Sequence, residues 1–299
     1  EGMFEECVNL TTCILPNSLN TVGSNAFYNC SILTSINIPS LISAINTTSF
    51  QGCSSLTNLV IHSGNILVST VFNGLPITTI TFDYDGSIPA NSCEYITSLS
   101  TVTISNLITS IGLHVFNGCN GLTNITIEAA SNLNSISSYS FANCSNLTYI
   151  NLPNTITIIP SYAFYGCVKL PEFVFSTNCT TIGDQAFKNC AEIITITIPN
   201  TVTNVGTNVF SGCSNLLTVI MLSNLVYYNI FNGVNSVRNL TLDYNGEISS
   251  SACFNQPLSN IIIGNTVTNI KQLAFKNCTN LTSIIIGENV TNISANCFS

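Results

Sequence analysis

A step of about 23 residues recurs along the chain and limits what it can fold into. The clearest example runs from Phe187 to Phe210, and both aromatics open the motif F-x-[GN]-C. Anchoring every repeat on this position gives about 13 repeats, with steps of roughly 21 to 25 residues. Such a period, with apolar residues at fixed offsets, is typical of repeat solenoids, in which each repeat contacts only its neighbours. We therefore predict one elongated body over residues 1–299.

Each repeat follows the pattern L-x-x-I-x-I-P-x-x-[VI]-x-x-[VI]-G-x-x-A-F-x-x-C. In its first part the apolar period is two, which predicts a strand with Ile36 and Ile38 on one face and Asn37 on the other. Pro39 cannot donate to a ladder of hydrogen bonds, so the strand should end there. A second short extended segment follows, as at residues 201–205.

The rest of the repeat should turn the chain back. A glycine ends the second segment, and we expect it to adopt a positive φ; these glycines are Gly23, Gly112, Gly183 and Gly206. The motif A-F-x-x-C is expected to form one helical or 3₁₀ turn. Each repeat is then one coil, and a lone coil buries too little to fold without neighbours. The predicted fold is a right-handed β-solenoid of the leucine-rich-repeat type, with parallel strands and short helical turns.

A second, longer period of about 160 residues spans seven repeats and indicates growth of the solenoid by copying. Phe50 corresponds to Phe210, and F-D-Y-D-G-S-I at 82–88 corresponds to L-D-Y-N-G-E-I at 242–248. Cys93 and Cys253 replace the anchor aromatic at equivalent places. We therefore interpret the chain as containing a duplicated block of seven repeats.

The aromatic anchors and the cysteines three residues after them are predicted to fill the interior. The chain has 14 cysteines, and their spacing, close to one repeat, excludes zinc clusters of the C-x₂-C type. The column could be a ladder of disulfides or a file of buried thiols, and we favour thiols because parallel side chains in a column rarely point at one another. The residues given this structural role are Phe27, Cys30, Phe50, Cys53, Phe116, Cys119, Phe141, Cys144, Phe164, Cys167, Phe187, Cys190, Phe210, Cys213, Phe275 and Cys278.

Composition excludes several classes of function. The net charge is −8, with only five basic residues, which argues against binding nucleic acid through phosphate contacts. The mean hydropathy of +0.44 suggests a membrane protein, but no run approaches the roughly 18 apolar residues of a spanning helix. Thr, Ser and Asn alternate with the apolar residues instead.

The units L-T-S-I-N-I-P, I-P-N-T-V-T-N-V-G and A-F-x-x-C together resemble the BspA-like leucine-rich repeats found in surface proteins of oral bacteria and of mucosal protozoan parasites such as trichomonads. The resemblance covers essentially the whole chain. It implies a cell-surface or secreted adhesin or antigen, with host matrix, host cell-surface proteins or other microbes as partners. It implies no enzymatic activity.

Catalytic chemistry has little support in the sequence. His62 and His114 lie in different repeats and are interpreted as surface turn residues. No Ser or Thr has a base beside it in the sequence, so no nucleophile can be named. Asp83, Asp85 and Gly86 could suggest calcium, but the further oxygen ligands of an EF-hand loop are missing, and a tight turn is favoured. We expect no enzyme, metal or cofactor.

The outward residues of the strands form a broad, almost uncharged surface of hydroxyls, amides and β-branched methyl groups. This composition could reflect only strand propensity and solubility. It also suits an extended surface that holds a large partner through many weak contacts. The candidate binding residues are Thr81, Thr103, Thr126, Tyr149, Asn151, Glu172, Thr197 and Thr241.

Twelve N-x-[ST] sequons could carry N-glycans; they lie at Asn9, Asn29, Asn46, Asn124, Asn143, Asn146, Asn178, Asn239, Asn277, Asn280, Asn289 and Asn292. Both ends of the chain fall within a repeat, so we expect a segment of a longer protein. Two interpretations of its function remain open: an extracellular adhesin or surface antigen, or an intracellular protein-binding scaffold of the same fold.

Overall fold

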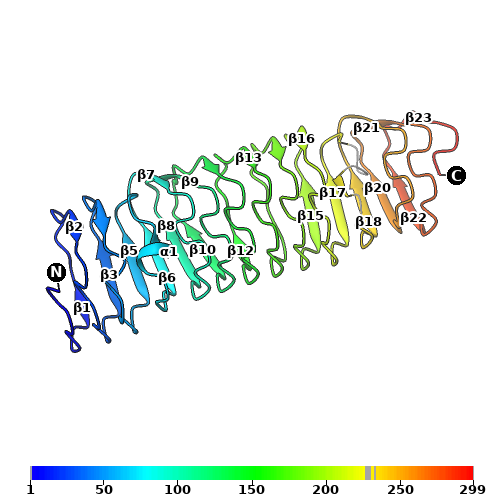
Figure 1. The fold of residues 1–299 in the computed structure, drawn as a ribbon. Coiled ribbons are helices and arrows are strands. Elements are labelled where there is room, and N and C mark those ends of the chain that lie inside the picture. The colour runs from blue at the N-terminus through cyan, green and yellow to red at the C-terminus, as the bar shows by residue number, and fades with distance from the viewer. Residues whose placement is uncertain (1, 226–229, 232–233, 299) are drawn as a thin grey trace. The chain divides into compact units, whose positions relative to one another are not determined.

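The fold is given by a computed structural model that describes residues 2–225, 230–231 and 234–298. Backbone contacts divide the chain into unit 1 (Glu1–Thr155) and unit 2 (Ile156–Ser299). Each unit is a parallel β-solenoid built from stacked coils of about 23 residues (Figure 1). The predicted fold class is confirmed, and a single body over residues 1–299 stays a prediction.

Unit 1 contains one long sheet and two short ones, all parallel. The long sheet has seven strands in chain order: β1 (Thr12–Cys13), β3 (Ser35–Ile38), β5 (Asn58–Ile61), β6 (Thr79–Phe82), β8 (Thr101–Ile104), β10 (Asn124–Ile127) and β12 (Tyr149–Ile150). The second segments of the coils pair as β2 (Thr21–Val22) with β4 (Ala44–Ile45), and as β7 (Gly86–Ile88), β9 (Ile108–Ile111) and β11 (Ser135–Ile136).

Unit 2 has a shorter main sheet of five strands: β15 (Thr195–Ile198), β17 (Thr218–Met221), β18 (Asn239–Leu242), β20 (Asn260–Ile263) and β22 (Ser283–Ile286). Its other strands form two sheets: β13 (Ile158–Ile159), β14 (Thr181–Ile182) and β16 (Asn204–Val205), then β19 (Gly246–Ile248), β21 (Val267–Ile270) and β23 (Asn292–Ile293). Before β15 the main sheet is reduced to an isolated bridge between Glu172 and Thr195.

That interruption has a cause in the sequence. Thr34 and Thr57, which precede their strands, donate their backbone N–H groups to the coil before them, at Thr11 O and Thr34 O. Pro171 occupies the equivalent position in its repeat and has no N–H to donate. The proline therefore removes one backbone donor at the start of this strand, while its carbonyl still accepts from Ile194 N of the next coil (3.2 Å).

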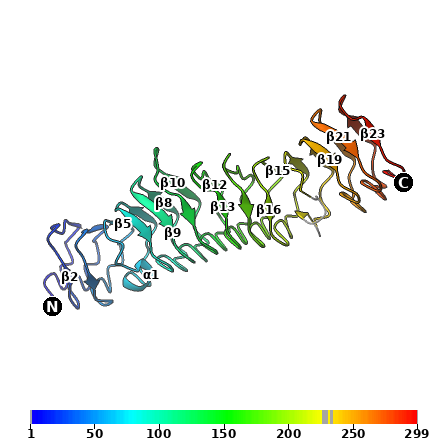
Figure 2. The ribbon, with the colours of Figure 1, turned by 90° about the horizontal axis from the view of Figure 1, so that it is seen from above.

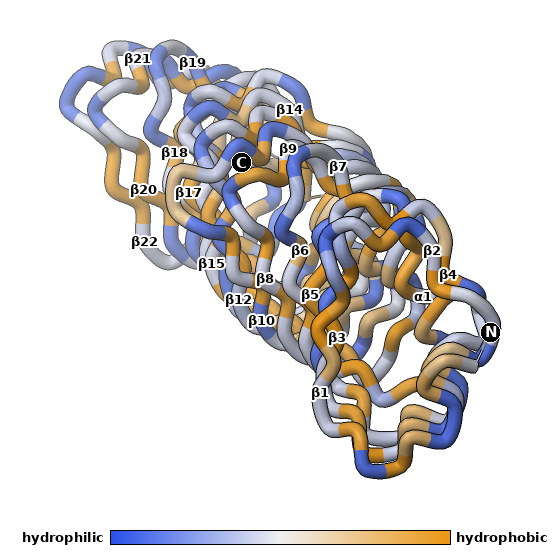
Figure 3. Tube along the Cα trace, turned by 90° about the vertical axis from the view of Figure 1, so that its left-hand side faces the viewer, coloured by the Kyte–Doolittle hydropathy of each residue, from blue (hydrophilic) through white to orange (hydrophobic). Residues whose placement is uncertain are grey.

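The period of two places alternate strand residues inside, as predicted. In β3 the buried residues are Ile36 and Ile38, while Asn37 is half-buried on the outward face. In-register pairing repeats this arrangement, so Ile36 pairs with Leu59 and Asn37 with Val60. Figure 3 shows the consequence as hydrophobic and hydrophilic stretches alternating along the coils.

The prediction of a helical or 3₁₀ turn at A-F-x-x-C is wrong. Among the described residues, helical structure occurs at α1 (Val68–Val71), which lies at the turns in Figure 2, and at Ile230, and neither lies in an A-F-x-x-C motif. Elsewhere residues with positive φ flank the anchor, as Asn25 (58°) and Asn29 (57°) flank Phe27. The Phe27 and Asn29 N–H groups donate to the next coil, at Ser49 O (2.8 Å) and Gln51 O (2.9 Å). A helical turn would keep such bonds within one coil, so stacking selects this turn.

The glycine prediction is also corrected. Gly112, Gly183 and Gly206, like Gly23, are absent from the residues with positive φ. A Cβ added to Gly183 would clash with the backbone N of Ser161, and one on Gly206 would clash with that of Asp184. Gly112, Gly183 and Gly206 are required because neighbouring coils approach closely at this point.

Stacked aromatic rings fill the interior of both units. Phe27 lies 5.1 Å from Phe4 and 5.0 Å from Phe50 between ring centroids, and Phe187 lies 5.6 Å from Phe210. All sixteen residues given a structural role are buried. Cys93 and Cys253 interrupt these stacks. The buried ring of Tyr84 lies near Cys93, and Tyr244 lies near Cys253 in the same way.

The cysteines act as thiols, because no disulfide joins any of the 14, all of which lie within the described residues. The thiol of Cys53 donates to Phe27 O (3.1 Å), and that of Cys213 donates to Phe187 O (3.2 Å). Phe27 O also accepts from Cys30 N (3.1 Å). Each such thiol therefore links one coil to the anchor carbonyl of the preceding coil, which explains why a small donor follows the aromatic by three residues.

Candidate binding surfaces

The outward face of each main sheet presents two rows of side chains. In unit 1, in-register pairing brings Thr81, Thr103 and Thr126 together on neighbouring strands. Tyr149 belongs to the other row, where it pairs with Asn124, and Asn151 lies just beyond β12. The unit 1 face is therefore mostly hydroxyl and amide, with Tyr149 as its large exposed ring.

In unit 2 the corresponding face is more apolar. Thr197 and Thr241 share one row, but Ile220 stands between them, and the row continues into Ile262 and Ile285. Exposure is 44% for Ile262 and 59% for Ile285. Glu172 lies in the second row, at the bridge with Thr195. It is the only charged residue in these two rows, all of whose members are described.

A groove of about 600 Å³ opens on this face where the sheet is interrupted. Val174, which is 70% exposed, and Ile194, which is 53% exposed, lie in its lining with Leu222. The candidate residues Glu172 and Thr197 lie in the same lining. The candidates predicted from the sequence do not include these aliphatic residues. Pro171 at a strand position is the signal that could have located the groove.

The floor of the groove is an aromatic cluster. Phe173 and Phe175 replace the usual inward isoleucines of this repeat, and their centroids are 5.0 Å apart. Phe173 lies 4.6 Å from Phe187 and 5.0 Å from Phe164, while Phe175 lies 5.6 Å from Phe187. A surface with a packed floor holds its shape, which is a favourable property for binding.

The prediction that the two histidines are surface turn residues holds only in part. The ring Nδ1 of His62 lies 2.9 Å from Asp83 O and 3.4 Å from Asp83 Oδ2, at the end of a strand. His114 does lie in a turn, with φ of 58°, but it is half-buried and stacks on Tyr139 at 4.7 Å. The D-Y-x-G segments are turns in which Gly86 has φ of 125° and Gly246 has φ of 116°.

The sequons occupy different environments. Asn46 is exposed, and its Oδ1 accepts from Thr48 N and Thr48 Oγ1, both at 2.9 Å. Asn29, Asn143 and Asn277 lie in the turns with positive φ. Asn124 and Asn239 lie on the outward rows of the main sheets. A glycan on either of the last two would cover part of a main sheet.

Comparison with protein-family models gives a match over the full length. The model described as "BspA type Leucine rich repeat region (6 copies)" matches residues 1–85, 86–217 and 218–299. The chain belongs to the BspA-type leucine-rich repeat family. The family resemblance inferred from L-T-S-I-N-I-P and A-F-x-x-C is thereby confirmed. No curated protein sequence matches this BspA-type chain.

Several solved structures are similar to the BspA-type chain. A leucine-rich repeat protein from Bacteroides ovatus is 22% identical, covers 98% of this chain and 85% of its own, and has a TM-score of 0.42. A leucine rich cell surface protein from Faecalibacterium prausnitzii is 21% identical, with coverages of 94% and 71% and a TM-score of 0.48. The pneumococcal vaccine antigen PcpA is 17% identical, with coverages of 97% and 76% and a TM-score of 0.41. The family assignment rests on the repeat model.

No helix in the described part of the BspA-type chain is long and apolar enough to cross a membrane. Within the same residues, no cluster of three or more His, Cys, Asp or Glu side chains is arranged to hold a metal ion.

Proposed function

We propose that this BspA-type protein is a non-catalytic, cell-surface or secreted binding protein, an adhesin or surface antigen. The observation that carries the proposal is the outward face of unit 2, where Val174, Ile262 and Ile285 are 70%, 44% and 59% exposed. Binding interfaces have an apolar centre from which charged residues are depleted. The rows of this sheet have that composition, with Glu172 alone carrying charge.

The proposed partners are proteins of the host matrix or host cell surface, or the surface of another microbe. A rigid, extended face suits such partners because many weak contacts can act together. N-glycans at exposed sequons such as Asn46 are proposed as a modification of the secreted form. An N-glycan at Asn239 would cover the proposed binding face, so we expect that sequon to be unmodified in the binding form.

The test compares two double variants of the full chain in binding to cultured host cells. Val174→Asp with Ile285→Asp places charge on the unit 2 face, and we expect cell binding to fall at least about tenfold, since buried charge in an interface is unfavourable. Thr81→Asp with Thr103→Asp is the matched control on unit 1. All four positions are outward, so both variants should fold. Equal binding by the two variants would refute the assignment to unit 2, and binding that survives protease treatment of the cells would refute a protein partner.

An intracellular scaffold of the same fold is a second candidate, and one observation favours it. The 14 cysteines form no disulfide, and reduced thiols are typical of proteins in reducing compartments. Surface biotinylation of intact source cells separates the two, because only an exported protein is labelled before lysis.

A further inference from the structure

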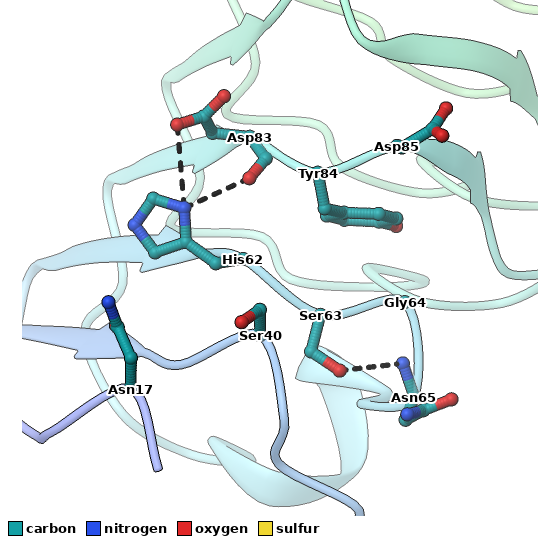
Figure 4. Close-up of a pocket in the computed structure, with 9 residues that line it drawn as sticks. All are labelled: Asn17, Ser40, His62, Ser63, Gly64, Asn65, Asp83, Tyr84 and Asp85. Carbon is teal, nitrogen blue, oxygen red and sulfur yellow. Dashed lines mark hydrogen bonds and ion pairs between the residues drawn. The ribbon is translucent and has the colours of Figure 1, made fainter. Parts of the chain in front are cut away.

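The duplicated block carries the same pocket twice, at the ends of main-sheet strands. In unit 1 the pocket has a volume of about 480 Å³ and lies at the ends of the strands, lined by Asn17, Ser40, His62, Asp83 and Tyr84 among others (Figure 4). In unit 2 the equivalent pocket has a volume of about 400 Å³. In its lining Asn200 replaces Ser40 and Leu222 replaces His62, while Asp243 and Tyr244 correspond to Asp83 and Tyr84. Pockets of this size accommodate small ligands.

The hollow arises from the D-Y-x-G segment. Strand β3 is followed by Pro39, whereas β6 ends at Phe82 and is followed by Asp83 and Tyr84. The Tyr84 ring turns inward until it is 8% exposed. Its hydroxyl donates to Ser87 O (3.1 Å). A Cβ on Gly64 would lie 3.0 Å from the Tyr84 ring, so a larger residue there would crowd this wall. Tyr244, 6% exposed, holds the same place in unit 2.

The two pockets share hydrogen-bond acceptors and lack lysine and arginine. The Asp83 side chain is 42% exposed, and its carboxylate lies against the His62 ring at the edge of the pocket. In unit 2, Asp243 Oδ1 accepts from Thr266 Oγ1 (2.6 Å) and keeps a second carboxylate oxygen. Neither lining contains Lys or Arg. A ligand for both must therefore donate hydrogen bonds and carry no negative charge.

The unit 2 pocket also holds a buried hydroxyl with no partner among the described residues. Ser223 is 4% exposed, and its Oγ makes no hydrogen bond to them. Its unit 1 counterpart, Ser63, donates to Ile42 O (3.2 Å). A buried polar group without a partner is unfavourable, and Ser223 lies in the wall of the pocket, where a ligand oxygen could satisfy its hydroxyl.

We propose that the two pockets are binding sites for a neutral saccharide unit. Sugar hydroxyls can donate to the Asp83 or Asp243 carboxylate and accept from a serine hydroxyl. A cationic ligand would depend on both acidic residues of unit 1, Asp83 and Asp85, yet Asn245 replaces Asp85 in unit 2. The features that the two copies share therefore select a neutral, hydroxyl-rich ligand. The unit 2 pocket adjoins the groove described above, because Leu222 lines both, but the argument for the saccharide site does not rest on the proposed protein-binding face.

The test is calorimetric titration of the full chain with methyl glycosides of neutral hexoses and N-acetylhexosamines, compared with a uronic acid and an amino sugar. We expect the unaltered chain to bind two neutral glycosides. Each Asp→Ala change should weaken the affinity of its own pocket at least about tenfold. At concentrations that saturate an unaltered pocket, the Asp83→Ala variant should therefore bind one glycoside, and the variant that also carries Asp243→Ala should bind none. Glu128→Ala is the matched control, because Glu128 follows strand β10 in the same way but lies outside the pocket, and it should bind normally.

A second pair of variants keeps the test decisive if the aspartate changes disturb folding. Ser40→Phe and Asn200→Phe are at exposed rim positions, and each should block its own pocket without changing the core. The proposal is overturned if the unaltered chain binds no neutral glycoside, if it binds only the amino sugar or the uronic acid, or if binding persists when both rims are blocked.

Discussion

Unit 1 and unit 2 contain copies of one block of repeats, yet they differ in their outward faces. The offset that carries Phe50 onto Phe210 also carries strands β5, β6 and β7 of unit 1 onto β17, β18 and β19 of unit 2. Their interiors share the aromatic stack, the thiol-to-carbonyl bonds and the cysteine that interrupts the stack. The outward row is mostly Thr and Asn in unit 1 and rich in Ile in unit 2. Copying therefore preserved what stacking requires and left the exposed positions free to diverge.

The buried thiols that both units share give the largest expected effect. This effect is a loss of stability at high pH, and it should be the same in unit 1 and in unit 2. Burial raises the pKa of Cys119 in unit 1 and of Cys213 in unit 2 to about 12. In the unfolded chain the thiol pKa is about 8.5, so above that pH the unfolded state loses protons that the folded state keeps. The contribution of these thiols to stability is therefore complete below about pH 8.5 and is lost as the pH rises toward 12.

The expected loss is about 1.4 kcal/mol per pH unit for each of these two thiols. Chemical denaturation between pH 7 and pH 11 measures this, with Cys119→Ala and Cys213→Ala as variants that should each show a shallower decline. A free energy of unfolding that stays constant over this range would contradict the prediction. A decline that only one of the two variants reduces would show that the shared thiols do not behave alike in the two units.

The next largest effect sharpens the difference between the two interiors. Phe27 and Phe187 are equivalent anchors, but Phe187 also packs against Phe173 and Phe175. Replacing a buried Phe by Ala costs about 3–5 kcal/mol. We expect Phe187→Ala to cost about 1 kcal/mol more than Phe27→Ala because it loses additional aromatic contacts. Urea denaturation of the two variants measures this difference in the free energy of unfolding. A larger loss of stability in Phe27→Ala than in Phe187→Ala would contradict the prediction.

A smaller effect should be equal in the two units. Gly52 and Gly212 have φ of 82° and 80°, and a Cβ added to either would clash with the side-chain Oδ1 of Asn29 or Asn189. Alanine at either site adopts an unfavourable left-handed conformation and displaces that asparagine, at a cost of about 1–3 kcal/mol. Thermal unfolding of Gly52→Ala and Gly212→Ala provides the measurement. If the loss of stability in one variant exceeded that in the other by more than the smaller loss itself, the two turns would not be equivalent.

The smallest effect concerns a side-chain pair that the copies do not share. His62 Nδ1 lies 3.4 Å from Asp83 Oδ2, and the two side chains are 34% and 42% exposed. In unit 2, Leu222 occupies the position of the histidine. Solvent-exposed pairs contribute at most about 1 kcal/mol. We expect His62→Leu to lower stability by no more than that, as measured by thermal unfolding at low and high salt. A greater loss would give this pair a structural role in unit 1 that unit 2 lacks.

The sequence by itself determined the coil. The period of two in Ile36 and Ile38, the proline at the strand end and the spacing of Phe and Cys predicted the parallel strands and the family. They could do so because stacking demands the same inward residue type at the same position in every repeat. The duplication that relates Phe50 to Phe210 was visible for the same reason.

Tertiary structure decided what depends on the neighbouring coil. The turn at A-F-x-x-C is not helical because the Phe27 N–H bonds to Ser49 of the next coil, and Gly183 is small because the backbone at Ser161 lies against it. The groove beside Val174 and the pockets beside Tyr84 and Tyr244 likewise need the positions of side chains from several coils. Those positions are set by contacts between residues far apart in the chain, which no single repeat contains.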